Sequence, residues 1–117
     1  TYKGPKEDRR SNTRLEYETA VGDLDTARAI LQALGFEAVC TVSKTRQTFR
    51  LGEVTACLDQ VDGLGPFLEL EHLLPDGAER ETAVSGLLDL LDRLGVSRQA
   101  LERRSYLELL LGRTRGR

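Results

Sequence analysis

Residues 67–72 read Phe67-Leu68-Glu69-Leu70-Glu71-His72, with leucine and glutamate at alternate positions. A period of two is typical of a β-strand, because successive side chains point to opposite faces. Both carboxylates therefore lie on one face of the predicted strand and the leucines on the other. Residues 14–18, 44–50 and 54–60 alternate in the same way. The sequence thus predicts antiparallel strands that share one charged face.

The turns predict how these strands pair. Leu51-Gly52 is a two-residue connector, and a glycine there is typical of a tight hairpin. Arg50 is then expected opposite Glu53. Counting back along both strands pairs Thr48 with Thr55, Arg46 with Cys57 and Lys44 with Asp59.

The second turn is expected over residues 62–66, with Val61 opposite Phe67. This register places Asp59 opposite Glu69, and Cys57 opposite Glu71.

Two facing carboxylates destabilise a sheet, so a cation is expected between Asp59 and Glu69. Lys44 would supply part of the positive charge. A divalent metal ion would supply the rest, because Mg²⁺ and Mn²⁺ prefer clustered carboxylate oxygens. Two plainer interpretations remain open at this point: the solvated face of an ordinary sheet and a structural network of ion pairs.

Six motifs follow one another along nearly the whole chain. They are Thr1-Tyr2-Lys3-Gly4-Pro5, Arg14-Leu15-Glu16-Tyr17-Glu18, Val42-Ser43-Lys44-Thr45-Arg46, Cys57-Leu58-Asp59, Gly63-Leu64-Gly65-Pro66-Phe67 and Leu68-Glu69-Leu70-Glu71. In this order and spacing the chain resembles the CYTH superfamily, which groups class IV adenylate cyclases with thiamine and inorganic triphosphatases. The Gly63-Leu64-Gly65 loop and the late segment 105–110 are most similar to the class IV cyclase branch.

The resemblance implies an α+β fold in which an antiparallel β tunnel has charged residues inside and helices packed on its outer face. It also implies the roles of individual residues in a triphosphate site that uses Mg²⁺ or Mn²⁺. The phosphate-binding residues would be Lys3, Arg14, Lys44 and Arg46; the metal-binding residues Asp59, Glu69 and Glu71; and the catalytic, metal- or water-orienting residues Glu16 and Glu18.

The chain departs from the family pattern at one signature. The motif glutamate-x-glutamate-x-lysine, expected on the first strand of the family, does not occur in the sequence. We therefore interpret residues 1–117 as the C-terminal portion of a single CYTH-like domain, beginning at the fourth strand of the tunnel. An isolated fragment of this kind is expected to lack the activity of its parent. Its open sheet edges favour pairing with another chain, so a homodimer is expected.

Helical periodicity predicts two main helices and a short third one. Apolar residues recur at helical spacing over 24–34 and 79–94, and a glycine follows each segment at Gly35 and Gly95. Ser105 and Glu108 have the spacing of a capping box at the start of a last helix. Residues 113–117 are expected to form a frayed basic tail. The apolar stripes are expected to cover the leucine-rich face of the sheet.

Composition bounds the function further. At 117 residues, with 39% hydrophobic and 31% charged residues, the chain suits one soluble globular domain. The net charge of -2 gives no reason to expect nucleic-acid binding. The sequence has no apolar run that would cross a membrane and no secretory signal pattern, so a cytoplasmic protein is expected.

The leading functional hypothesis is a metal-dependent enzyme domain that converts ATP to cyclic AMP and pyrophosphate. A second hypothesis is a triphosphatase that hydrolyses inorganic, thiamine or nucleoside triphosphate. A third is a module that binds polyphosphate or a nucleotide without catalysis. All three use the same charged residues, because phosphoryl transfer depends mainly on positioning and on neutralising charge.

Overall fold

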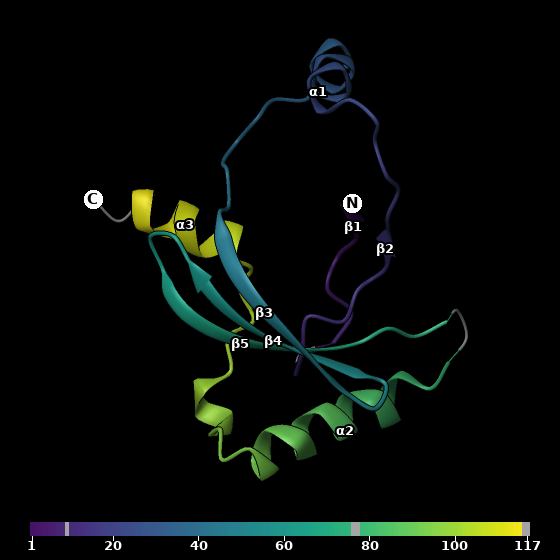
Figure 1. The fold of residues 1–117 in the computed structure, drawn as a ribbon, viewed down its shortest axis with the longest axis vertical. Helices are drawn as coiled ribbons and strands as arrows, with labels where there is room; N and C mark the ends of the chain where they lie inside the picture. Colours follow the sequence, from purple (N-terminus) through teal and green to yellow (C-terminus); the bar gives the residue numbers. More distant parts are fainter. Residues whose placement is uncertain (9, 76–77, 116–117) are drawn as a thin grey trace. The chain divides into compact units, whose positions relative to one another are not determined.

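The computed structural model describes residues 1–8, 10–75 and 78–115, and the chain divides into two compact units. Unit 1 comprises residues 1–41 and unit 2 comprises residues 42–117. Each unit is described by itself, and Figure 1 labels its helices and strands. Within the described ranges, no helix has the length and apolar character needed to cross a membrane.

Unit 1 holds two short strands and one helix. Strands β1 (Tyr2–Lys3) and β2 (Glu16–Tyr17) pair antiparallel, and the rings of Tyr2 and Tyr17 stack with their centroids 5.8 Å apart. Helix α1 (Leu24–Ala33) begins where the Asp23 carboxylate accepts a hydrogen bond from the Thr26 amide at 3.0 Å. It ends at Ala33, and Gly35, two residues later, has a φ of 101° that gives the left-handed turn of a Schellman motif.

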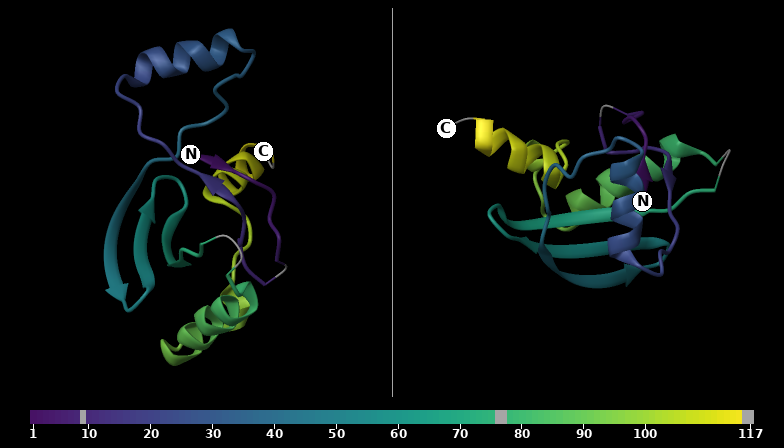
Figure 2. Two further views of the ribbon diagram at one scale, coloured as in Figure 1. Left: turned by 90° about the vertical axis from the view of Figure 1, so that its right-hand side faces the viewer. Right: turned by 90° about the horizontal axis from the view of Figure 1, so that it is seen from above.

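Unit 2 is a three-stranded antiparallel sheet with two α-helices. Strands β3 (Lys44–Leu51), β4 (Val54–Val61) and β5 (Gly65–His72) lie in the order β3-β4-β5. Helix α2 (Arg80–Arg93), the short 3₁₀ helix η1 (Arg98–Ala100) and helix α3 (Tyr106–Arg115) follow. Figures 1 and 2 show α2 on one side of the sheet and α3 on the other.

The described strands thus form one two-stranded and one three-stranded antiparallel sheet, which confirms the predicted α+β class. The three predicted helices are confirmed as well. At the start of α3, the Ser105 hydroxyl accepts a hydrogen bond from the Glu108 amide at 3.1 Å. The helix continues to Arg115, so the first residues of the expected basic tail are helical; residues 116–117 lie outside the described residues.

The predicted register of the first hairpin is wrong by two residues. Leu51 pairs with Val54, so the turn consists of Gly52 and Glu53 rather than of Leu51 and Gly52. The reason is that both favoured hairpin turns require a positive φ at their first central residue. Gly52 adopts a φ of 64° there, which glycine does without strain and leucine does not.

The second hairpin is also displaced by two residues, in the opposite direction. Val61 pairs with Gly65 instead of Phe67, so the loop contains three residues and not the expected five. The Leu64 amide donates to the Val61 carbonyl at 3.0 Å, and Gly63 has a φ of 82°, as the third residue of a type II turn requires. Consequently Asp59 lies opposite Phe67 and Glu69 lies opposite Cys57, so the two carboxylates do not face each other.

The separation of the two sheet faces survives this shift, because a slip of two residues preserves the alternation of side chains. One face, called here the charged face, carries Lys44, Arg46, Asp59, Glu69 and Glu71. The opposite face, called here the apolar face, carries Phe49, Leu51, Leu58, Leu68 and Leu70.

Helix α2 covers part of the apolar face. Helix α2 packs against β5 and contributes Ala83, Val84 and Leu88 to the buried core, beside Ala56 of β4. Phe49 and Leu58 remain 50% and 46% exposed. The core of unit 2 is therefore small for the amount of apolar surface that its sheet carries.

The turn analysis predicts opposite effects for alanine at two glycines. Gly52→Ala places a side chain at a φ of 64° and is expected to destabilise unit 2 by about 1 kcal/mol. Gly86→Ala lies inside α2, where an added Cβ meets nothing within 4 Å, and is expected to stabilise the helix by up to about 1 kcal/mol. Urea denaturation gives the free energy of unfolding of each variant, to be compared with that of the unaltered protein. Equal stability of the two would contradict the assigned turn.

Candidate active site

One guanidinium holds the centre of the charged face together. Arg46 Nε donates to Asp59 Oδ1 at 2.7 Å, and Arg46 Nη2 donates to Asp59 Oδ2 at 2.7 Å. The same Nη2 atom donates to Glu69 Oε2 at 2.8 Å. Arg46 lies on β3, Asp59 on β4 and Glu69 on β5, so this cluster joins all three strands.

The observed register explains why this cluster forms. Arg46 lies directly opposite Asp59, where the planar guanidinium matches a carboxylate with two parallel hydrogen bonds. Glu69 lies opposite Cys57 and therefore diagonal to Asp59, close enough for Arg46 to reach both. The cation that the sequence required is thus Arg46, whereas Lys44 was expected in that place.

Asp59 is the buried charge on which this cluster is built. Its side chain is 0% exposed, and it accepts a third hydrogen bond from the Tyr106 hydroxyl at 2.7 Å. The hydrogen bonds from Arg46, with a smaller contribution from Tyr106, hold the pKa of Asp59 below its usual value despite burial. The same pairing raises the pKa of the Arg46 guanidinium. Asp59 is therefore an ionised carboxylate surrounded by donors.

Tyr106, the first residue of α3, is a part of the site that the sequence did not reveal. Besides its bond to Asp59, its ring lies 5.1 Å from that of Phe67 and 5.3 Å from the Lys44 ammonium, measured to its centroid. Burial and the hydrogen bond to Asp59 raise the pKa of its hydroxyl, so the hydroxyl stays protonated and donates. No local pattern marks this residue, because 47 positions separate it from Asp59.

The remaining predicted residues of unit 2 flank the cluster. Lys44 lies at the first position of β3, opposite Val61, and Glu71 lies on β5, opposite Thr55. Lys44 is exposed and Glu71 is half-buried. The structure thus brings Arg46, Asp59 and Glu69 into direct contact and connects Lys44 to them through Tyr106.

The other four predicted residues belong to unit 1. Lys3 on β1 lies 3.9 Å from the Glu16 carboxylate on β2, measured between Nζ and Oε1. Arg14 precedes β2 and is half-buried, whereas Glu18 follows β2 and is exposed. Within unit 1, therefore, Lys3 and Glu16 form a pair at the surface.

The carboxylates of β5 suit a hard divalent cation better than Asp59 does. Mg²⁺ is commonly held by only one or two carboxylates, with water and phosphate oxygens completing its shell. Glu69 and Glu71, two residues apart on one face of β5, provide such a pair. Both oxygens of Asp59 already accept hydrogen bonds. In the part of the chain that the structure describes, no group of three metal-binding side chains is assembled.

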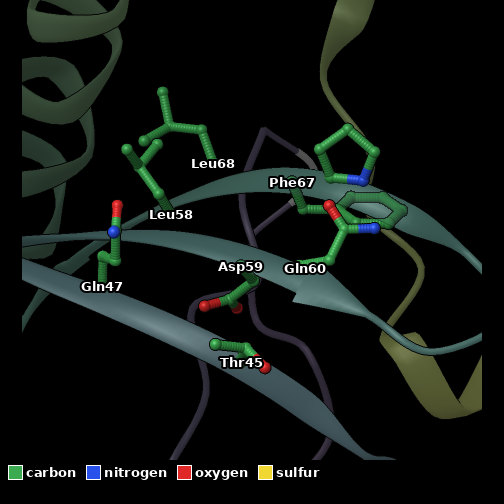
Figure 3. A pocket seen from close by; sticks show the side chains of 8 residues that line it. Thr45, Gln47, Leu58, Asp59, Gln60, Phe67 and Leu68 are labelled. Atoms are coloured by element: carbon green, nitrogen blue, oxygen red, sulfur yellow. The ribbon is translucent and has the colours of Figure 1, made fainter.

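A shallow hollow lies on the opposite side of the sheet from the cluster. It is lined by Leu58, Leu68, Pro66 and the polar side chains Gln47 and Gln60, among others. Figure 3 shows Leu58 and Leu68 leaving the sheet on one side, while the Asp59 carboxylate points away from them. Most of its lining belongs to the incompletely covered apolar face, although Asp59 and Phe67 of the charged face also border it.

The fold and the site together define a class of protein: an α+β domain whose antiparallel sheet carries interleaved cations and carboxylates on one face. The profile of the CYTH domain matches residues 1–106 of the chain. The chain therefore belongs to the CYTH domain family, as the motifs had indicated.

Two relatives carry adenylate cyclase names. The chain is 39% identical over 109 residues to MJ0240 of Methanocaldococcus jannaschii, which is provisionally named an adenylate cyclase; the match covers 93% of this chain and 62% of that protein. It is 35% identical over 104 residues to adenylate cyclase CyaB of Aeromonas hydrophila, covering 89% of this chain and 51% of that protein. The chain thus spans between half and two thirds of the length of these relatives.

Solved structures of Pyrococcus horikoshii proteins have the same fold. The PH1819 protein superposes with a TM-score of 0.88 at 46% identity, over 96% of this chain and 63% of that one. The PH1012 protein superposes with a TM-score of 0.83 at 31% identity, over 92% of this chain and 63% of that one.

The lowered pKa of Asp59 predicts how stability depends on pH. A carboxylate whose pKa is lower in the folded state stabilises the fold above its unfolded pKa, which is about 3.9. That contribution is lost as the pH falls from there through the lowered pKa of the folded state. We expect the free energy of unfolding to fall over this range, and Asp59→Asn to lack this component. Urea denaturation between neutral pH and about pH 3 compares the two proteins. An identical pH dependence would contradict the assignment.

Proposed function

We propose that this chain is part of a metal-dependent enzyme that acts on a triphosphate, and that its reaction is that of a class IV adenylate cyclase. In this reaction the 3′ hydroxyl of ATP attacks the α-phosphorus and pyrophosphate leaves. The observation that carries the proposal is the Arg46–Asp59–Glu69 cluster, with Lys44 beside it on the same sheet face. The cyclase names of both relatives favour this reaction over hydrolysis.

The charge pattern of the sheet suits this chemistry. A triphosphate carries several negative charges, and its transfer reactions depend mainly on holding it in place and stabilising the charge that moves to the leaving group. Lys44 and Arg46 are the cations of the charged face that would bind phosphate oxygens. Because Arg46 is held by Asp59 and Glu69, its guanidinium is preorganised before the substrate arrives.

The carboxylates would have two different tasks. Glu69 and Glu71 are the residues that would hold Mg²⁺ or Mn²⁺, which, when bound, neutralises charge on the phosphate oxygens. Asp59 remains a predicted metal-binding residue, although in this structure its oxygens hold Arg46 and Tyr106. In unit 1, Lys3 and Arg14 would contribute further phosphate contacts. Glu16 and Glu18 would orient the nucleophile or a second metal ion.

The reaction is tested by product analysis of the full-length protein. ATP or inorganic tripolyphosphate is incubated with Mg²⁺ or Mn²⁺, and the products are separated by chromatography. Cyclic AMP with pyrophosphate is the expected result from ATP. Release of orthophosphate would instead assign a triphosphatase, and binding without turnover would assign a non-catalytic phosphate-binding module.

Substitutions on the charged face are expected to separate catalysis from binding. Glu69→Ala should lower metal-dependent turnover on the order of a hundredfold, since it removes a metal-binding carboxylate. Lys44→Ala and Arg46→Lys should mainly raise KM, by about tenfold or more, since the first removes a charged phosphate contact and the second removes the guanidinium while keeping a cation beside the buried Asp59. Glu53→Ala, at the exposed hairpin turn, is the control and should leave both constants unchanged. Full turnover in Glu69→Ala would contradict the metal assignment.

A further inference from the structure

Tyr106 connects the last helix to two cations of the charged face, Lys44 and Arg46. Its hydroxyl donates to Asp59 Oδ2, the same oxygen that accepts from Arg46 Nη2. Its ring lies under the Lys44 ammonium at 5.3 Å. Tyr106 thus contacts both Lys44 and the carboxylate partner of Arg46. This arrangement is independent of where unit 1 lies, because every residue in it belongs to unit 2.

The hydrogen bond to Asp59 restricts the carboxylate that holds Arg46. Asp59 receives two bonds from the guanidinium, and both groups belong to the sheet. The third bond, from a ring half-buried against Phe67, ties this pair to helix α3. A donor held by a packed ring is more rigid than a water molecule in the same place. Tyr106 therefore limits the directions in which the Arg46 guanidinium points.

The ring acts on Lys44 in a different way. A lysine ammonium has four rotatable carbon–carbon bonds behind it, so on an open strand end it samples many positions. The face of an aromatic ring attracts the ammonium electrostatically and favours positions above it. Lys44 lies two residues before Arg46 on the same face of β3, so Tyr106 holds both cations at adjacent positions.

We propose that Tyr106 is a positioning residue of the triphosphate site, which orients Arg46 through Asp59 and Lys44 through its ring. The inference rests on the proposed function for the nature of the ligand. It goes beyond that function in assigning a role to the N-terminal end of α3. Tyr106 itself is not expected to touch the substrate.

Two substitutions separate the contributions of Tyr106. Tyr106→Phe removes the hydroxyl but keeps the ring beside Phe67 and Lys44, whereas Tyr106→Leu removes both. Binding of inorganic tripolyphosphate to the full-length protein is measured by calorimetry with the metal chelated. We expect Tyr106→Phe to weaken binding about fivefold, and Tyr106→Leu to weaken it about twofold to fivefold more. Leu107→Ala, the next residue on α3 and an exposed one, is the control and should bind as the unaltered protein does.

A double-mutant cycle shows whether Tyr106 acts through Arg46. If it does, Tyr106→Phe should weaken binding less than about twofold in an Arg46→Lys background, which keeps a cation beside the buried Asp59 but lacks the guanidinium that Tyr106 orients. An equal loss in both backgrounds would mean that the hydroxyl only supports the fold, and would overturn the inference.

A second measurement needs no ligand. The Arg46 Nε hydrogen donates to Asp59, so its exchange with solvent, followed by NMR, reports how firmly the guanidinium is held. It should exchange faster in Tyr106→Phe than in the unaltered protein or in Leu107→Ala. Unchanged exchange would overturn the inference. Absence of tripolyphosphate binding by the unaltered protein would contradict the proposed function, whereas binding that Tyr106→Phe leaves unchanged would contradict only the role of Tyr106.

Discussion

The carboxylate of Asp59 is the constraint on which unit 2 depends. An ionised group with no exposed side-chain surface is stable only when it is paired and fully hydrogen-bonded, and Arg46 and Tyr106 meet that requirement. Because Arg46 also reaches Glu69, one guanidinium links the three strands across the charged face. The same bonds that make the buried charge tolerable also fix the direction of a cation. The hydrogen bonds among Arg46, Asp59, Glu69 and Tyr106 thus stabilise the sheet and also hold the Arg46 guanidinium in one orientation.

The position of these charges also explains the balance between the two faces. In most small sheets the apolar side supplies the cohesion, yet here Leu58 and Phe49 remain about half exposed and helix α2 covers only part of that side. Two of the buried apolar residues, Cys57 and Val61, lie on the same side as Asp59. The surroundings of Asp59 are therefore partly apolar. Because the local dielectric is low there, the hydrogen bonds between Asp59 and Arg46 are stronger than they would be in water.

The sequence predicts the local structure well and the pairing of strands less well. Alternation of Leu68, Glu69, Leu70 and Glu71 is a direct consequence of strand geometry, and Asp23, Gly35 and Gly95 mark helix ends through their own backbone chemistry. The register of the strands is harder to predict, because moving either hairpin by two residues leaves every side chain on the same face of the sheet. The φ of Gly52, the short loop at Gly63 and the pairing of Arg46 with Asp59 distinguish the two registers. Tyr106 was beyond prediction, since its partner is distant in the chain and nothing in residues 105–110 signals a buried hydroxyl.

The two-residue ambiguity has a consequence for how this sheet folds. A hairpin that closes on Leu51-Gly52 buries the same apolar residues as the native one, so hydrophobic collapse does not discriminate between them. Two features favour the native register over the misaligned one. The native turn is free of backbone strain, and Arg46 lies opposite Asp59, whereas in the misaligned hairpin it would lie opposite Cys57. The misaligned hairpin would still place Lys44 opposite Asp59, but a lysine cannot form the two parallel hydrogen bonds that Arg46 gives. An ion pair thus favours one register over another that buries the same apolar residues.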